Sequence, residues 1–240
     1  MTNDIKSITT LGVIGGLGPM ATAYFMELLT KMTDAKCDQE HLDIITYSKP
    51  SIPDRTAYIL GNSDLNPAPP MIEAGLKLKE IGADAIAIPC ITAHYFHDEL
   101  ESGIGLPVIH AMRETAQYLK ENEITKVGLM ATDGTVQSGI FQKSLEEEGI
   151  EVITPYSQNL VMKIIYDEVK SNKPVNMEEF NQVIYELFGR GAQRVLLGCT
   201  ELSVAKKDFK VDSRILDVLE VLSRSVLTYA GKLSPNYKII

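Results

Sequence analysis

The sequence predicts an α/β protein of two pseudo-symmetric lobes, each built on a parallel sheet, with the active site in the cleft between them. Short apolar runs alternate with helical segments of ten or more residues, which is typical of parallel α/β architecture. The chain also repeats itself at a period near half its length, because residues 8–14 resemble residues 124–130 and Phe25 corresponds to Phe141 at the same offset. A period this long indicates a duplicated lobe rather than a solenoid.

The repeat places one cysteine after a short apolar strand in each half of the chain. Gly82 lies eight positions before Cys90, and Gly191 lies eight positions before Cys199. The segment between each pair reads as a buried strand. Two related lobes that face each other across a cleft would bring the two thiols to opposite sides of one small pocket.

The first lobe is predicted to comprise residues 1–108 together with 213–240, and it contains Cys90. The glycines at 15, 16 and 18 favour a tight turn, and Pro19 suits the first turn of the helix that follows. Loop 48–64 is long enough to carry functional residues. The predicted strands are 11–14, 42–47, 85–88 and 106–109, and the predicted helices are 19–32, 67–80, 92–99 and 217–229.

The second lobe is predicted to comprise residues 109–212, and it contains Cys199. Its apolar periodicity alternates between strand and helix as in the first lobe. The predicted strands are 126–130, 151–153 and 194–198, and the predicted helices are 111–121, 141–148, 160–170 and 177–189.

Composition narrows the classes of partner and compartment. The net charge of −9 argues against a nucleic-acid or anionic-membrane partner, and no apolar run approaches membrane-spanning length. The polar N-terminal residues lack a signal-peptide core, and three cysteines cannot all pair with one another. We therefore expect a cytoplasmic protein in which Cys90 and Cys199 persist as thiols, while Cys37 is exposed and structurally neutral.

The two thiols have a chemical use at the positions predicted for them. Ligands of open α/β sheets gather at the carboxyl ends of the strands, and Cys90 and Cys199 both fall there, each just before a predicted helix. Backbone N–H groups and the dipole of a helix N-terminus favour a thiolate. A thiolate on one face of a bound carbon and a thiol on the other could remove a proton and return it from the opposite side.

Four motifs together resemble the signatures of the cofactor-independent aspartate/glutamate racemases. The resemblance covers nearly the whole chain in the right order, and the two cysteine motifs are its specific part. It implies a pseudo-symmetric two-lobed fold, often dimeric, with two catalytic cysteines and no pyridoxal phosphate. We expect no metal site. The motifs are Gly15-Gly16-Leu17-Gly18-Pro19, Pro53-Asp54-Arg55-Thr56, Pro89-Cys90-Ile91-Thr92-Ala93-His94 and Gly198-Cys199-Thr200-Glu201-Leu202.

The same resemblance implies roles for individual residues. Cys90 and Cys199 become the acid/base pair that interconverts the enantiomers of an amino acid. Arg55 and Lys170 become the partners of an acidic side chain, which makes aspartate the expected substrate and glutamate or a broader set the alternatives. Arginine suits this role because it grips a carboxylate through two parallel hydrogen bonds.

Further residues are expected around the substrate. Thr92 and Thr200, with their neighbouring amides, are expected to hold the α-carboxylate, and Leu17 is expected to contribute its backbone. The repeat also places Thr132 and Thr135 in the pocket.

Two residues near Cys90 affect what the resemblance implies. Ile91 stands where the family usually has Asn, which removes a side chain able to donate and accept hydrogen bonds and puts the substrate in doubt. The backbone of Ile91 is still expected to bind the substrate. His94 is expected to pack in the interior rather than to touch the thiol.

Three other interpretations stay open on the sequence. Residues 16–21 fit the G-x-G-x-x-A dinucleotide pattern, but the second strand ends in Ser48-Lys49-Pro50, which lacks the acid that binds ribose. A decarboxylase or cis–trans isomerase of small dicarboxylates could use one cysteine as proton donor or nucleophile. A non-catalytic two-lobed binding protein would leave the two matched thiols unexplained.

Overall fold

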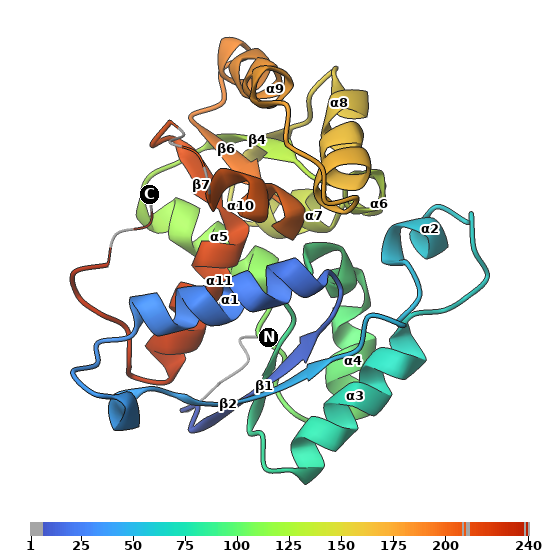
Figure 1. Ribbon diagram of the computed structural model, residues 1–240. Coiled ribbons are helices and arrows are strands. Elements are labelled where there is room, and N and C mark those ends of the chain that lie inside the picture. The colour runs from blue at the N-terminus through green and yellow to red at the C-terminus, as the bar shows by residue number, and fades with distance from the viewer. Residues whose placement is uncertain (1–6, 208, 210–211, 238, 240) are drawn as a thin grey trace.

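The computed structural model describes residues 7–207, 209, 212–237 and 239, and it folds into two lobes, each around a parallel sheet (Figure 1). The first sheet has the order β2-β1-β3 and the second has the order β5-β4-β6-β7, with all strand pairs parallel. In each sheet the first strand of the lobe lies between the second and the third. This shared order confirms the predicted pseudo-symmetric α/β architecture.

The first lobe alternates strands with helices along the chain. The strands are β1 (Thr10–Gly15), β2 (Asp43–Ser48) and β3 (Ala85–Ala87). The α-helices are α1 (Pro19–Met32), α2 (Arg55–Ile59), α3 (Ala68–Glu80) and α4 (His97–Ile104), and two 3₁₀ helices, η1 (Asp38–Glu40) and η2 (Ile91–Phe96), lie between them.

The second lobe repeats this arrangement with one more strand. Its strands are β4 (Lys126–Met130), β5 (Glu151–Ile153), β6 (Arg194–Leu197) and β7 (Ile215–Asp217). Its helices are α5 (Ala111–Glu121), α6 (Asp133–Ser138), α7 (Ile140–Glu146), α8 (Gln158–Met162), the π-helix η3 (Lys163–Val169), α9 (Met177–Gly189), α10 (Thr200–Lys207) and α11 (Val218–Tyr229).

Equivalent glycines let a helix pack closely on the central strand of each sheet. A Cβ atom at Gly12 of β1 would lie 3.3 Å from the Cβ of Leu78 in α3 and 2.7 Å from Ile86 of β3. A Cβ atom at Gly128 of β4 would lie 2.8 Å from the Cβ of Leu187 in α9. The two lobes therefore use the same packing solution at matching positions of the repeat.

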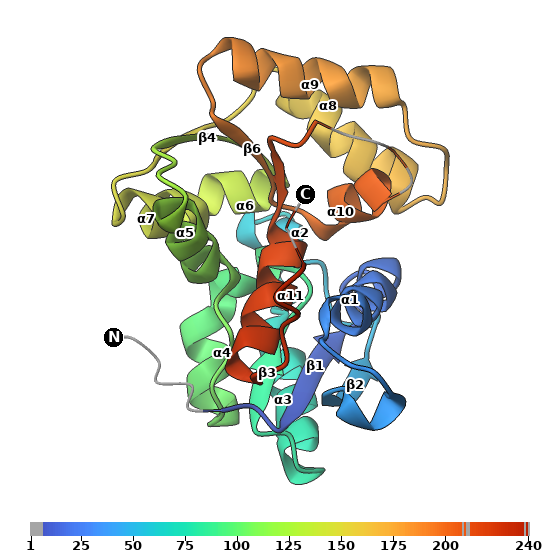
Figure 2. The same ribbon diagram turned by 90° about the vertical axis from the view of Figure 1, so that its left-hand side faces the viewer.

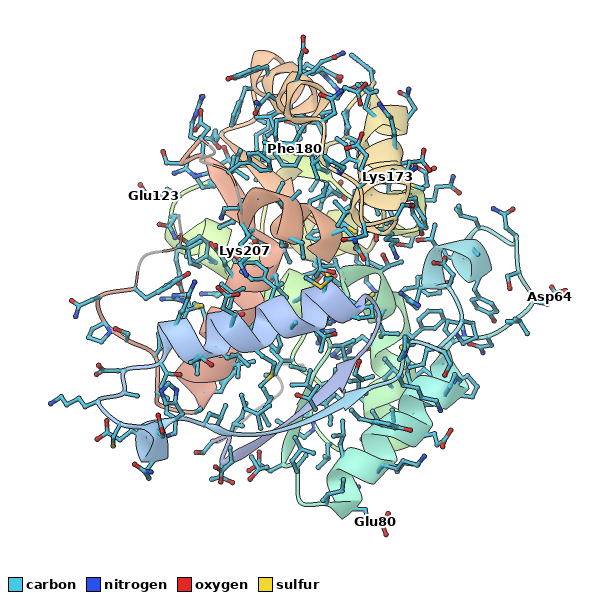
Figure 3. The ribbon with its side chains drawn as sticks, viewed as in Figure 1. Asp64, Glu80, Glu123, Lys173, Phe180 and Lys207 are labelled. Atoms are coloured by element: carbon cyan, nitrogen blue, oxygen red, sulfur yellow. The ribbon has the colours of Figure 1, made fainter. Side chains whose placement is uncertain are left out.

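The largest core cluster joins the two lobes. It contains Phe25 of α1, Met112 of α5, Phe141 of α7 and Leu222 of α11, all nearly inaccessible to solvent. Figure 2 shows α11 running from the second lobe down along the first lobe, beside α1. Because this cluster removes apolar side chains of both lobes from water, it stabilises the arrangement of the lobes as well as each lobe. Figure 3 shows the contrast at the periphery, where Glu80 and Glu123 project outward while Phe180 lies inside the second lobe.

Several predicted elements differ from the observed ones. The helix predicted at 141–148 is preceded by α6 and begins at Ile140, because Gly139 adopts φ +65° and breaks the helix there. The helix predicted at 160–170 is an α-helix followed by the π-helix η3, and loop 48–64 contains the short helix α2. The strand predicted at 106–109 is a single parallel bridge between Ile86 and Val108.

The end of the chain contributes to both lobes. The sequence assigned residues 213–240 to the first lobe, but β7 pairs with β6 and places residues 215–217 in the second sheet. Helix α11 then packs against α1, as its shared core cluster shows. The rest of the predicted division, at 1–108 and 109–212, stays a prediction.

Three buried or half-buried histidines pack together behind the Cys90 segment. The ring centroids of His97 and His110 lie 4.3 Å apart, and those of His94 and His110 lie 5.8 Å apart. His94 is 2% exposed and contacts the Ile88 carbonyl at 3.3 Å, which confirms that it packs in the interior. Burial, and then the neighbouring histidines, lower the pKa of His94 to about 3 and that of His110 to about 2.

Because the pKa values of His94 and His110 are lowered by folding, we expect the protein to lose stability in mild acid. In the unfolded chain a histidine takes up a proton near pH 6.5, whereas folded His94 and His110 stay neutral to much lower pH. The free energy of unfolding should therefore fall by about 1 kcal/mol for each of these histidines between pH 6.5 and 5.5. Urea unfolding at the two pH values measures the loss, and a His110→Asn variant should lose less. An equal loss in both proteins would contradict the assignment.

Candidate functional site

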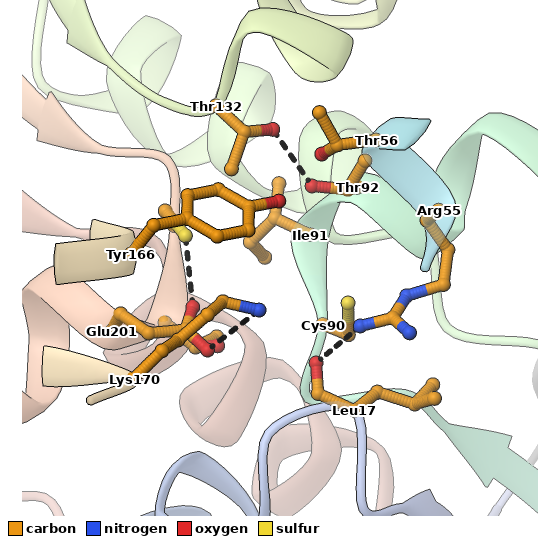
Figure 4. Close-up of a pocket in the computed structure, with 12 residues that line it drawn as sticks. Leu17, Arg55, Thr56, Cys90, Ile91, Thr92, Thr132, Tyr166, Lys170 and Glu201 are labelled. Atoms are coloured by element: carbon orange, nitrogen blue, oxygen red, sulfur yellow. Dashed lines mark hydrogen bonds and ion pairs between the residues drawn. The ribbon is translucent and has the colours of Figure 1, made fainter. Parts of the chain in front are cut away.

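One pocket lies between the lobes, at the carboxyl ends of strands from both sheets. The pocket is small, and Figure 4 shows the side chains around it. Each lobe contributes a strand–helix junction that carries a cysteine, namely β3–η2 and β6–α10. The lining residues are Leu17, Arg55, Thr56, Cys90, Ile91, Thr92, Thr132, Tyr166, Lys170, Cys199, Thr200 and Glu201.

Cys90 reaches the pocket at the end of the first sheet. It follows β3 in an extended conformation, and the 3₁₀ helix η2 begins at the next residue. Its side chain is buried and free of any disulfide. The Arg55 guanidinium lies beside it in Figure 4. Burial acts to lower the pKa of Arg55, but the interactions with Cys90 and Asp54 raise it overall. The first sulfur therefore faces a fixed positive charge.

Cys199 occupies the matching position of the second sheet and has a different neighbour. It lies between β6 and α10, is 4% exposed, and its Sγ donates a hydrogen bond to Glu201 Oε2 at 2.9 Å. Burial and the Glu201 carboxylate raise the pKa of Cys199 well above its ordinary value. The second sulfur therefore faces a carboxylate at hydrogen-bond distance.

Arg55 is anchored in the pocket by backbone carbonyls. Its Nη2 donates to Leu17 O at 2.9 Å and its Nη1 donates to Pro53 O at 3.0 Å. Asp54 caps helix α2 by accepting from Ala57 N at 2.7 Å, which fixes the start of the helix. The buried Nε has no hydrogen-bond partner among the described residues. An unsatisfied buried donor is costly, so this atom is a candidate contact for a ligand.

Lys170 approaches the pocket from the end of the π-helix. Its Nζ lies 3.5 Å from Glu201 Oε1 and 4.9 Å from the centroid of the Tyr166 ring. Burial acts to lower the pKa of Lys170, but the nearby Glu201 and Cys199 raise it overall. A second cation therefore lines the pocket.

Three threonine hydroxyls form a closed hydrogen-bonded group at the junction of the lobes. Thr92 Oγ1 lies 3.1 Å from Thr132 Oγ1 and 2.9 Å from Thr135 Oγ1, and the last two lie 3.1 Å apart. Thr92 and Thr132 line the pocket, whereas Thr135 lies behind them and is fully buried. The sequence placed Thr135 in the pocket itself. Its place inside the lobe follows from the first turn of α6, where Thr135 N donates to Thr132 Oγ1 at 3.2 Å.

The other predicted site residues also line the pocket. Thr200 opens helix α10, and Leu17 presents its carbonyl to Arg55. Ile91 lines the pocket and belongs to the core cluster that joins the lobes. The residue that replaces the expected Asn thus adds apolar surface next to Cys90.

Three lining residues were not predicted as site residues. Thr56 follows Arg55 directly, and Tyr166 precedes Lys170 by four positions, a spacing that puts both on one face of a helix. Glu201 belongs to the second cysteine motif and lies two residues after the thiol. Proximity to predicted residues in the sequence was the available signal for all three.

The glycine-rich turn after β1 is filled by protein atoms. Gly16 adopts φ +88°, and a Cβ atom there would lie 2.6 Å from the backbone N of Lys49. A Cβ atom at Gly18 would lie 2.8 Å from Glu201 Oε1. These glycines make room for the second loop and for a carboxylate, whereas a dinucleotide turn uses that room for pyrophosphate.

The part of the chain that the structure describes contains no group of three or more His, Cys, Asp or Glu side chains placed to hold a metal ion. It also contains no helix that is both long and apolar enough to span a membrane.

Comparison with known proteins identifies the family. The model of the Asp/Glu/hydantoin racemase family matches residues 14–226. The broad-specificity amino-acid racemase RacX of Bacillus subtilis is 26% identical over 223 residues, which cover 91% of this chain and 96% of RacX.

Solved structures give the same result. The Picrophilus torridus aspartate racemase superposes with a TM-score of 0.83 at 34% identity, covering 94% of this chain and 96% of its own. A putative Asp/Glu racemase from Yersinia pestis superposes with a TM-score of 0.77 at 28% identity, covering 93% of this chain and all of its own. The chain therefore belongs to the Asp/Glu/hydantoin racemase family, which confirms the resemblance drawn from the cysteine motifs.

Proposed function

We propose that this racemase interconverts L- and D-aspartate by proton transfer between two cysteines, without a bound cofactor. The observation that carries the proposal is the shared pocket. Cys90 and Cys199 line it from equivalent strand ends of the two lobes, with Arg55 and Lys170 beside them. A pocket with one sulfur from each lobe suits attack on one carbon from two sides.

The chemistry needs one thiolate and one thiol. The thiolate takes the α-proton, and the electrons of the broken C–H bond delocalise into the α-carboxylate. The thiol on the other face then gives its proton to the same carbon, and the S–H bond breaks as the new C–H bond forms. The roles of Cys90 and Cys199 exchange in the reverse direction.

Polar groups around the pocket support the intermediate and select the substrate. Thr92 and Thr200, with backbone amides at the two helix starts, suit an α-carboxylate whose negative charge grows as the proton leaves. Arg55 and Lys170 suit a second carboxylate on the side chain, and the unpartnered Nε of Arg55 offers one donor for it. Two cations in a buried pocket favour a dicarboxylate over a neutral amino acid.

A glutamate or broad-specificity racemase is the second candidate. Ile91 favours it, because an apolar side chain next to Cys90 tolerates different substrates more readily than an Asn that must hydrogen-bond to one. The similarity to a racemase of broad specificity points the same way. A decarboxylase or isomerase of dicarboxylates leaves one of the two thiols without a task.

The setting of the enzyme is also a proposal. We expect a homodimer in the cytoplasm that acts on a free amino acid and binds neither nucleic acid nor membrane. Light scattering of the purified protein gives the oligomeric state, and a mass of one chain would rule out the dimer.

A chiral assay of the common amino acids tests the function directly. The purified protein, with no added cofactor, should convert L-aspartate to the racemic mixture faster than any other amino acid. Chromatography after derivatisation with a chiral reagent measures both enantiomers. Faster conversion of glutamate, or similar rates for many amino acids, would favour the second candidate, and no conversion of any of them would remove the proposal.

A further inference from the structure

The Glu201 carboxylate occupies a position that neither the repeat nor the predicted mechanism accounts for. It lines the pocket at 6% exposure, accepts the hydrogen bond of Cys199 at 2.9 Å, and lies 3.5 Å from Lys170 Nζ. In Figure 4 it lies next to Lys170, away from Cys90 and Arg55. It therefore contacts one of the two sulfurs and leaves the other alone.

The fold keeps the carboxylate in place. Gly18 packs against it so closely that a Cβ atom there would lie 2.8 Å from Glu201 Oε1. Glu201 also lies in the first turn of α10, where the helix dipole favours a negative charge. Lys170, at the end of η3, places a positive charge 3.5 Å from Glu201 Oε1. These contacts fix the Glu201 side chain where it accepts the hydrogen bond of Cys199.

The equivalent position beside Cys90 carries no charge. Cys90 is followed two residues later by Thr92, whereas Cys199 is followed two residues later by Glu201. Thr92 bonds to other threonines, and the charged neighbour of Cys90 is the Arg55 guanidinium. The two sulfurs therefore occupy matching positions of the repeat but have different charged neighbours, which are Arg55 for Cys90 and Glu201 with Lys170 for Cys199.

We infer that Glu201 is a positioning residue that keeps the proton on Cys199 in the free enzyme, so that Cys90 beside Arg55 is the resting base. A carboxylate disfavours a second negative charge at hydrogen-bond distance and stabilises the S–H donor. The raised pKa of Cys199, caused by burial and Glu201, agrees with this geometry. The part of the inference that concerns catalysis rests on the proposed function.

The proton balance shows the consequence for turnover. A substrate whose α-proton faces Cys90 meets the resting form: Cys90 takes that proton, and Cys199 gives its own. The product leaves Cys199 as a thiolate next to the Glu201 carboxylate, and the enzyme returns to rest when a solvent proton reaches Cys199 and Cys90 releases one. The other enantiomer can react only with the form of the enzyme in which Cys199 is the thiolate and Cys90 is the thiol, before these two proton transfers with solvent.

The two directions should therefore differ in kcat and in KM separately. Their kcat/KM values must be equal, because the enantiomers have equal free energy. The enantiomer that needs the less populated form should show the higher KM and, in proportion, the higher kcat.

Alkylation of the cysteines across a pH series tests the inference without any substrate. Iodoacetamide reacts with thiolates, and peptide mass spectrometry reads Cys90 and Cys199 separately, with the exposed Cys37 as an internal reference for the reagent. In Glu201→Gln, the curve of Cys199 alkylation rate against pH should move to lower pH, because a neutral amide no longer opposes the thiolate. Lys170→Met should move it to higher pH, because Lys170 acts to lower the pKa of Cys199.

Two controls complete the experiment. Glu201→Asp should leave the Cys199 curve above that of Glu201→Gln, and Glu99→Gln, at an exposed position of α4, should leave it unchanged. A Cys199 curve that stays in place in Glu201→Gln would overturn the inference, as would equal shifts of Cys90 and Cys199. If the protein racemises aspartate but Glu201→Gln leaves the Cys199 curve in place, the inference is wrong and the proposed function stands. If the curve shifts but the protein racemises no amino acid, the proposed function is wrong and the role of Glu201 stands.

Discussion

Replacing Cys90 or Cys199 with alanine is expected to lower kcat for aspartate racemisation by about a thousandfold or more in both directions. Each variant keeps one sulfur, which can accept or deliver a proton on one face and has no partner on the opposite face. Inversion of the carbon needs both. Chiral chromatography of timed samples measures the rate for each enantiomer.

Cys37→Ala is the matched control for these variants. Cys37 is exposed and lies between α1 and η1, outside the set of pocket-lining residues, so its removal should leave the rate unchanged. Because Cys90 and Cys199 are buried, thermal unfolding of each variant shows whether a lost rate reflects lost fold. Full racemisation by either folded variant would contradict the two-cysteine mechanism.

Arg55→Ala is expected to reduce kcat/KM for aspartate by about a hundredfold, while neutral amino acids lose far less. Arg55 is 7% exposed and its buried Nε has no partner among the described residues, so a substrate carboxylate can bond to it away from water. A hydrogen bond to a charged group contributes about 1.5–3 kcal/mol. Initial rates with aspartate and alanine measure the difference.

Arg55→Lys separates side-chain recognition from packing. A lysine keeps the positive charge but loses the planar fork that bonds to Leu17 O, to Pro53 O and to a carboxylate together. The lysine variant should recover part of the aspartate activity. Equal losses for acidic and neutral substrates in both variants would remove Arg55 from substrate selection and leave it a structural role.

The architecture could be predicted because it depends on local pattern and repetition. Apolar strands, the turn before Pro19 and the shared spacing before each cysteine are all written in short stretches of sequence. They predicted which strand end each sulfur occupies, and the structure brings both ends to one pocket. Strand β7 escaped prediction because its three residues run directly into the cap of α11, where Asp217 accepts from Leu219 N at 2.9 Å.

The chemistry of the individual half-sites was harder to predict. The π-helix that delivers Tyr166 and Lys170 has no distinctive sequence pattern, so their approach to the pocket depends on tertiary packing. Glu201 depends on Gly18, which lies far away in the chain and makes room for the carboxylate. Thr135 lies behind Thr92 and Thr132 because a repeat fixes the position of a residue along an element, whereas the depth of its side chain depends on the neighbours.

The destination of solvent hydrogen tests the central claim most directly. L-aspartate is incubated with the protein in deuterium oxide. During the first few per cent of conversion the two enantiomers are separated, and mass spectrometry measures the deuterium content of each. Two sulfurs on opposite faces predict that the D-aspartate formed carries one deuterium while the remaining L-aspartate carries none. D-aspartate that keeps the original proton, or deuterium that enters L-aspartate before any inversion, would show that a single base serves both faces and would contradict the account.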